Sequence, residues 1–134
     1  MASVLFLDDD HDRHDRFRAR IEALGYLTRF RMIYVHSAHD AIAALREHEG
    51  EITQAFLDHD LSVADQMAVP GEPTLAPTGM VVVDHIVTMQ RPPEAIVVHS
   101  LNYTAAIEMC ARLTGHGKIA VTRVPFSLLL MQLT

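Results

Sequence analysis

Acidic, imidazole and hydroxyl side chains follow directly after three apolar runs of this sequence, and they are the residues best suited to chemistry. The polar clusters are Asp8-Asp9-Asp10, Asp58-His59-Asp60 and His99-Ser100. The runs that precede them are Val4–Leu7, Ala55–Leu57 and Ala95–Val98. Short apolar runs of this kind are typical of buried strands. Open α/β folds bind ligands beyond the carboxyl ends of parallel strands, so the sequence predicts one site at that edge.

Carboxylates at this density raise the free energy of the protein unless protons or a cation neutralise them. Carboxylate oxygens are hard ligands that suit Mg²⁺ or Mn²⁺. We therefore predict a divalent-metal site formed by Asp8, Asp9, Asp58 and Asp60. The alternative is that one or two of the acidic residues near the N-terminus only cap the first helix. Asp10 is expected in the solvated first turn of that helix.

Two histidines beside these acids have the chemistry to move protons. His59 lies between two aspartates, and His99 ends the neighbouring apolar run. Because the pKa of histidine lies near neutrality, we predict His59 and His99 as catalytic acid and base, next to a catalytic Asp58. Together with His14 they also form an imidazole–carboxylate set that would accept Mn²⁺, Fe²⁺ or Zn²⁺. The alternative is a packing or surface role, which we assign to the remaining histidines.

Several other polar residues near these clusters are suited to binding a phosphate group. Arginine binds phosphate through a planar, bidentate fork and stays charged. We predict that the substrate-binding residues are Ser100, Asn102, Arg123, Arg13 and His14. Structural roles are the alternative, because serine and asparagine also cap helices, and surface arginines usually form weak ion pairs.

The spacing of apolar residues predicts alternating strands and helices that would position these clusters. The predicted strands are Ser3–Asp8, Phe30–His36, Ile52–Asp58, Ala95–His99 and Ile119–Arg123. The predicted helices are His11–Leu24, Ala38–His48, Met80–Met89, Tyr103–Leu113 and Phe126–Leu133. Five βα units predict an α/β fold of the flavodoxin-like, receiver-like (βα)5 type, a doubly wound parallel sheet in a three-layer α/β/α domain spanning residues 1–134. The first and third strands flank its switch point, where Asp8, Asp9 and Asp58 should converge.

The segment 62–78 carries four of the glycine and proline residues of the chain and is predicted to form an irregular loop. Loops of this length are usually either functional or disordered. It could serve as a lid over the site, with Gly71 and Gly79 as hinges. A disordered insertion is the alternative.

The composition limits the classes of function. Hydrophobic residues make up 49% of the chain and charged residues 21%, which fits an ordered globular protein. The net charge of −6 disfavours an extended nucleic-acid surface or attachment to anionic membranes. It leaves room for a small phosphate-containing substrate such as a nucleotide, because a bound cation reverses the local charge. One cysteine and no signal peptide or membrane-length apolar run predict a cytoplasmic protein. Apolar residues 128–131 could serve a homodimer or cover the sheet.

Short motifs along nearly the whole chain carry a resemblance to a known family. They are Phe6-Leu7-Asp8-Asp9-Asp10, Arg13-His14, Phe17, Leu57-Asp58-His59-Asp60-Leu61, Thr78-Gly79, Val98-His99-Ser100, Asn102, Met109, Arg123 and Pro125-Phe126. In order and spacing they resemble the cyclic-phosphate-processing receiver-like family, an offshoot of the receiver domains of two-component signalling. The resemblance implies a receiver fold reused as an enzyme that acts on cyclic phosphates.

Two departures from these families bear on the site. Ordinary receivers have a lysine at the end of the fifth strand that holds the phosphoryl group, and here that region reads Thr122-Arg123-Val124-Pro125. Arg123 could take this role. The family also usually has proline and glycine soon after the position of Asn102, where this chain has Tyr103-Thr104-Ala105-Ala106.

Three functions fit these observations. The first is a metal-dependent phosphodiesterase that opens a cyclic phosphate, on a cyclic nucleotide or at a 2′,3′-cyclic RNA end. The second is a signalling receiver in which Asp58 accepts a phosphoryl group. The absence of the lysine, and the histidine and aspartate beside Asp58, favour the first over the second. The third is a non-catalytic module that sequesters a nucleotide or binds a protein partner.

Overall fold

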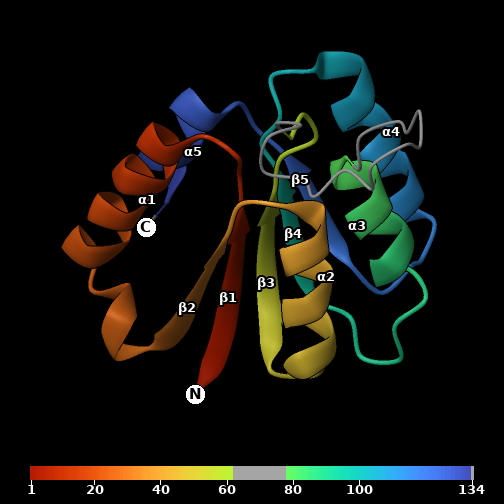
Figure 1. Ribbon diagram of the computed structural model, residues 1–134, viewed down its shortest axis with the longest axis horizontal. Helices are drawn as coiled ribbons and strands as arrows, with labels where there is room; N and C mark the ends of the chain where they lie inside the picture. Colours follow the sequence, from red (N-terminus) through yellow and green to blue (C-terminus); the bar gives the residue numbers. More distant parts are fainter. Residues whose placement is uncertain (62–77, 134) are drawn as a thin grey trace, which may run out of the picture.

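Five parallel strands form one sheet at the centre of the computed structural model, which describes residues 1–61 and 78–133 (Figure 1). The strands are β1 (Ala2–Leu7), β2 (Phe30–Val35), β3 (Ile52–Leu57), β4 (Ala95–Val98) and β5 (Ala120–Arg123). They lie in the order β2-β1-β3-β4-β5. This order confirms the predicted flavodoxin-like, doubly wound sheet, and each strand ends within one residue of its predicted bounds.

Helices cover both faces of this sheet. They are α1 (His11–Ala23), the 3₁₀ helix η1 (Tyr26–Thr28), α2 (Ala38–Glu47), α3 (Gly79–Ile86), α4 (Tyr103–Thr114) and α5 (Phe126–Gln132). Figure 1 shows α1 and α5 on one side of the sheet and α2, α3 and α4 on the other. Helix α3 is three residues shorter at its C-terminal end than predicted, because the amides of Thr88 and Met89 bond three residues back rather than four. The short helix η1 is not among the elements predicted from sequence.

Alternation along β1 explains how one strand serves two cores. Val4 and Phe6 lie in the core beneath α1 and α5, whereas Leu5 and Leu7 lie in the larger core beneath α2, α3 and α4. Successive residues of a strand point to opposite faces, and a strand with helices on both sides must therefore be apolar throughout. Residues 4–7 are fully buried, as such a position requires.

Polar side chains fix the starts of the helices next to the sheet edge. Ser37 caps α2 as predicted, because its side chain accepts a hydrogen bond from the amide of Asp40 at 3.1 Å. Asp10 caps α1 by accepting from the amide of Arg13 at 3.0 Å. At the other end of α1, Gly25 takes a positive φ of 74°, a conformation that glycine adopts without strain and that ends the helix.

Helix α3 begins in close contact with the end of β3. The amide of Gly79 donates to the carbonyl of His59 at 2.9 Å. A Cβ atom at residue 79 would collide with the carbonyl oxygen of Asp58, so only glycine fits here. Gly79 is therefore a site of close approach between the start of α3 and the residues that follow β3. The predicted lid and its second hinge, Gly71, lie outside the described residues.

In the described part of the chain, no helix is long and apolar enough to cross a membrane. Within α5, Leu129 is buried against the core, whereas Leu128 and Met131 are exposed. The last helix thus covers the sheet with one face and presents apolar side chains on the other.

Candidate functional site

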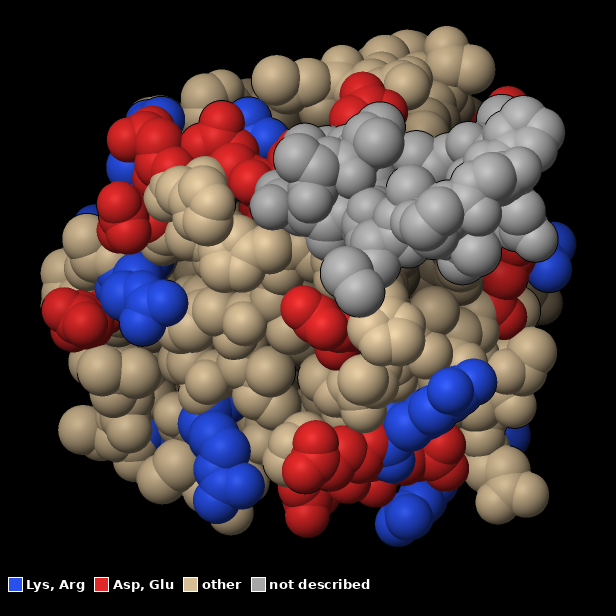
Figure 2. Space-filling view, viewed as in Figure 1, with Lys and Arg blue, Asp and Glu red and all other residues tan. Residues whose placement is uncertain are grey.

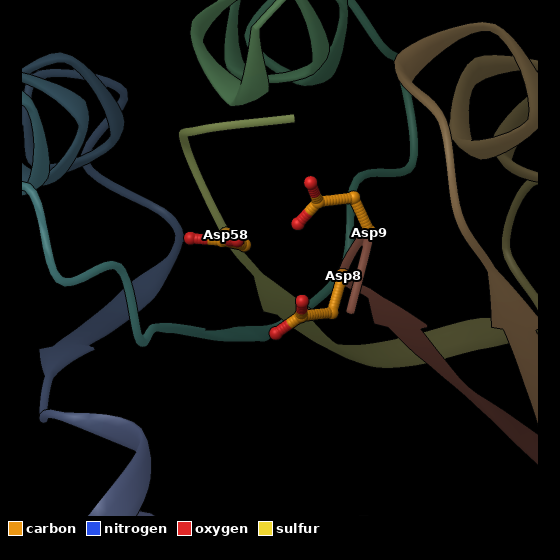
Figure 3. Close-up of side chains that lie close together, drawn as sticks. All are labelled: Asp8, Asp9 and Asp58. Atoms are coloured by element: carbon orange, nitrogen blue, oxygen red, sulfur yellow. The ribbon is translucent and has the colours of Figure 1, made fainter. Parts of the chain in front are cut away.

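The parallel register brings the predicted acidic residues to one edge of the sheet. Leu7 of β1 pairs with Leu57 of β3, so the next residues along, Asp8 and Asp58, lie side by side. The amide of Asp58 bonds to the carbonyl of Leu7 at 3.2 Å, which fixes the turn beyond each strand. Asp9 completes the group, and one oxygen from each of the three carboxylates lies within 4.8 Å of the others. Figure 3 shows the three side chains extending from the two strand ends into a common space.

Arg13, from the first turn of α1, lies within this acidic group. Its Nε donates to Asp8 Oδ2 at 2.7 Å, and its Nη2 donates to Asp8 Oδ1 at 2.8 Å. The same Nη2 lies 3.5 Å from Asp9 and 3.5 Å from Asp58, and Nη1 lies 3.5 Å from Asp10. The hydrogen bonds that Arg13 donates to Asp8 raise the pKa of Arg13 above its usual value. Arg13 is thus the internal counter-cation of the group.

One arginine leaves the acidic group under-neutralised. Asp8 is fully buried and Asp58 is 4% exposed, so water screens them poorly. Burial, and then repulsion from Asp8, raises the pKa of Asp58 to about 7, although Arg13 acts in the opposite direction. Such a raised value means that ionised Asp58 lacks sufficient positive charge around it. Figure 2 shows acidic and basic side chains gathered at the upper left of the molecule, over α1.

The donor set fits a hard divalent cation. Three carboxylate oxygens are close enough together to share one ion, and Mg²⁺ and Mn²⁺ prefer oxygen ligands. The unbalanced charge at Asp58 is the electrostatic condition that a cation would relieve. The residues that would hold it are Asp8, Asp9 and Asp58. The fourth predicted ligand, Asp60, is not part of this group.

Asp60 instead forms a short chain of polar contacts that leads away from the acidic group. Its Oδ1 lies 2.7 Å from His59 Nδ1 and accepts a hydrogen bond from Asn102 Nδ2 at 3.3 Å. The hydrogen bond from His59 lowers the pKa of Asp60. Asp58 and Asp60 diverge because the chain leaves the strand conformation after Leu57. The structure thus places Asp60 as the partner of His59.

His99 is buried next to Asp8 and takes a different position from the one expected of a proton donor. Its side chain is fully enclosed, its ring stacks on Phe6 at 5.2 Å between centroids, and its Nδ1 lies 3.6 Å from Asp8 Oδ2. Neither ring nitrogen has a hydrogen-bond partner among the described residues. Burial lowers the pKa of His99 to about 4. His99 is therefore neutral at pH 7.

The remaining predicted residues take supporting positions. His14 is buried, and its Nε2 donates to the backbone carbonyl of Asp8 at 2.7 Å. Ser100 accepts from the amide of Asn102 at 3.1 Å, and Asn102 caps α4 by accepting from the amide of Ala105. Arg123, at the end of β5, lies over the ring of Tyr103 at 4.5 Å. His14 thus bonds to the acidic group through the backbone of Asp8, whereas Ser100, Asn102 and Arg123 contact groups outside it.

Two features of the site were missed by sequence reasoning. The first is the position of Arg13 among the acids, for which the four-residue spacing from Asp9 was an available signal. The second is a stack of imidazoles beside Asp8, in which His36 lies 4.0 Å from His14 and 4.8 Å from His11 between ring centroids. These histidines come from two elements, so only the pairing of β1 with β2 brings them together.

Comparison with known families identifies the family of this chain. The family model described as "cyclic-phosphate processing receiver domain" matches residues 3–115. The chain belongs to this family. The expected family membership, based on the motifs around Asp8, Asp58 and His99, is thereby confirmed. No curated protein sequence matches the chain.

Solved receiver domains share the fold of this family member at low sequence identity. A CheY-like response regulator receiver domain from Methylobacillus flagellatus is 17% identical, with a TM-score of 0.59 over 93% of this chain and 86% of that one. The receiver domain of the sensor histidine kinase PA1611 from Pseudomonas aeruginosa, with magnesium in its active-site cleft, is 14% identical. The TM-score is 0.62, and the match covers 97% of this chain and 92% of that one. CheY from Borrelia burgdorferi, in complex with CheX, BeF3 and magnesium, is 14% identical. The TM-score is 0.63, and the match covers 97% of this chain and 84% of that one.

Proposed function

We propose that this receiver-fold protein is a metal-dependent phosphodiesterase that opens a cyclic phosphate, such as a cyclic nucleotide or a 2′,3′-cyclic RNA end. The observation that carries the proposal is the group of three carboxylates, Asp8, Asp9 and Asp58, whose oxygens lie within 4.8 Å of one another at the sheet edge. The family to which the chain belongs supports the class of substrate. Magnesium in the cleft of the receiver domain of PA1611 supports the class of metal.

A divalent cation held by the three carboxylates would supply Lewis-acid chemistry, polarising a phosphoryl oxygen and lowering the pKa of a bound water. Asp8 and Asp58 are suited to this task because the turns that carry them are fixed by backbone bonds between β1 and β3. Asp9 lies on the more exposed side of the group, where a substrate would approach.

His59 is the residue that we assign to proton transfer. Asp60 holds Nδ1 of His59 at 2.7 Å, which favours the tautomer with the proton on Nδ1 and leaves the lone pair on Nε2. A base oriented in this way can accept a proton from an attacking water. His99 receives no such role, because its burial keeps it neutral and away from solvent. We assign it to the support of Asp8 instead.

A second candidate function is a phosphoacceptor receiver, in which Asp58 would accept a phosphoryl group from a small donor or a kinase. The fold similarity to CheY from Borrelia burgdorferi, solved with BeF3 and magnesium, favours it. The contact of Arg123 with Tyr103 argues against it, because the residue in the position of the receiver lysine is then engaged outside the acidic group.

Two parallel assays separate these functions. In the first, the protein is incubated with cyclic mononucleotides, cyclic oligonucleotides and 2′,3′-cyclic-ended RNA in Mg²⁺, Mn²⁺ or chelator, next to an Asp58→Asn variant. In the second, the same two proteins are incubated with acetyl phosphate and Mg²⁺ and analysed by mass spectrometry. Metal-dependent ring opening that is lost in the variant supports the phosphodiesterase. A mass increase of one phosphoryl group, absent from the variant and without ring opening, supports the receiver. A ligand that is retained unchanged supports a sequestering module.

A further inference from the structure

We propose that Arg13 is a resident cation that a divalent metal displaces from the carboxylate group, and that the displaced guanidinium then binds the phosphate of the ligand. This inference rests on the metal site of the proposed function and adds a binding sequence to it. Arg13 would have two alternative positions, one on Asp8 and one on the ligand, and the metal would select between them.

The contacts of Arg13 show that the metal and the guanidinium cannot occupy the group together. Nη2 lies 2.8 Å from Asp8, 3.5 Å from Asp9 and 3.5 Å from Asp58, so it lies between the same three carboxylates that would bind the ion. A Mg²⁺ ion bound to these carboxylates would lie about 2.1 Å from each ligand oxygen. It would therefore occupy the space that Nη2 fills, and two positive charges would lie in contact.

The acidic group can accept a further ligand in addition to the contacts with Arg13. Arg13 supplies one positive charge to three carboxylates. Beside Asp8 lies His99, fully buried, with both ring nitrogens unpartnered among the described residues and Nδ1 3.6 Å from the carboxylate. A buried carboxylate whose buried polar neighbour has no hydrogen-bond partner is poised to accept a further ligand.

Arg13 can leave without any change in the backbone. It is the third residue of α1, and its side chain is 23% exposed, so rotation of the side chain alone carries the guanidinium toward solvent. On that side lies Asp10, whose carboxylate is 42% exposed and 3.5 Å from Nη1. A guanidinium released to this position is accessible from solvent, and its planar fork suits the oxygens of a phosphate.

The arrangement couples the two ligands. A metal must overcome the bonds between Arg13 and Asp8 to bind, and a phosphate stabilises the released arginine, so each ligand should strengthen the binding of the other. Without phosphate, the arginine should weaken the binding of metal. Removal of the guanidinium should therefore have opposite effects on the affinities for metal and for phosphate.

The test is the binding of Mn²⁺ to the purified full chain, followed by the electron paramagnetic resonance signal of free Mn²⁺, with and without inorganic phosphate. Arg13→Gln should bind Mn²⁺ at least about tenfold more tightly than the unmodified protein in the absence of phosphate, because a repelling charge is removed. Phosphate should tighten Mn²⁺ binding to the unmodified protein more than it tightens Mn²⁺ binding to Arg13→Gln. The matched control is Arg16→Gln, which removes the same charge from the same helix at a residue that forms its ion pair with Asp12.

Equal or weaker Mn²⁺ binding by Arg13→Gln would overturn the inference. If the variant fails to fold, the Nε–H resonance of Arg13 in the unmodified protein provides the measurement. Saturating Mg²⁺ should shift this resonance and speed its exchange with water, because the 2.7 Å bond to Asp8 breaks; an unchanged resonance would overturn the inference. Absence of Mn²⁺ binding in every variant would instead remove the metal site itself, and both proposals with it.

Discussion

Replacement of Asp58 by asparagine should stabilise the metal-free protein at alkaline pH. Asp58 is buried next to Asp8, and its pKa is raised from 3.8 to about 7. The two values lie about three pH units apart, and each unit corresponds to about 1.4 kcal/mol, so ionisation of this one group costs the folded state about 4 kcal/mol above pH 7. Asparagine has nearly the same shape and carries no charge. Its carbonyl oxygen can also keep the 2.9 Å bond from the amide of His59.

The direction in which the stability changes with pH follows from proton binding to Asp58. Between pH 3.8 and about 7 the folded chain holds a proton on Asp58 that the unfolded chain has lost, so the contribution of Asp58 to stability falls as pH rises through this window. The difference between Asp58→Asn and the unmodified protein should therefore be small near pH 4 and grow to roughly 2–4 kcal/mol at pH 8. Because both proteins share every other titrating group, their difference isolates Asp58.

Urea unfolding followed by circular dichroism, in chelator and at pH 5, 6, 7 and 8, measures this difference. Asp60→Asn is a suitable control, because the pKa of Asp60 is lowered by His59 rather than raised. The control should show no gain in stability at pH 8. A difference in the free energy of unfolding that does not change with pH, or a loss of stability of Asp58→Asn at pH 8, would show that ionised Asp58 has sufficient positive charge around it.

Three further outcomes follow from the same geometry. Gly79→Ala should destabilise the protein by about 2 kcal/mol or more in urea unfolding, because the added Cβ collides with the carbonyl of Asp58. Gly115→Ala is the control and should have little effect, since the nearest contact to its added Cβ is 3.4 Å. Equal effects of the two substitutions would contradict the close approach at Gly79. Asp60→Asn should lower kcat about 10- to 100-fold with little change in KM, because His59 loses its orienting partner, and an unchanged kcat would remove His59 from proton transfer. Mg²⁺ at about 10 mM should raise the melting temperature of the unmodified protein and leave that of Asp58→Asn unchanged. An equal rise of the melting temperature in both proteins would place the metal site elsewhere.

The elements and their order could be predicted from sequence because the relevant signals are local. Apolar runs such as Val4–Leu7 are buried on both faces of a parallel sheet, and caps such as Ser37 mark the start of a helix. The convergence of Asp8 and Asp58 followed from topology alone, since neighbouring parallel strands end at the same edge. These steps need no knowledge of side-chain conformation.

The details of the site depend on side-chain packing, which the sequence pattern does not encode. Asp60 contacts His59 and Asn102 rather than the three carboxylates, because its direction depends on how the chain turns after β3. Arg123 is turned toward Tyr103, a neighbour supplied by another element. His99 is enclosed because the ring of Phe6 stacks on it, and this burial determines its protonation. Each of these outcomes requires three-dimensional contacts.

In the proposed function, the three carboxylates hold a cation that promotes the opening of a cyclic phosphate. The most direct measurement is a ³¹P nuclear magnetic resonance time course of pooled cyclic phosphates with the protein in Mg²⁺ and then in chelator. In Mg²⁺, the resonance of one cyclic phosphate should be replaced by that of a phosphomonoester, or of a linear phosphodiester for a cyclic oligonucleotide. This conversion should stop in chelator and in Asp58→Asn. Conversion that continues unchanged in chelator, or the absence of any conversion in Mg²⁺ and Mn²⁺ alike, would contradict it.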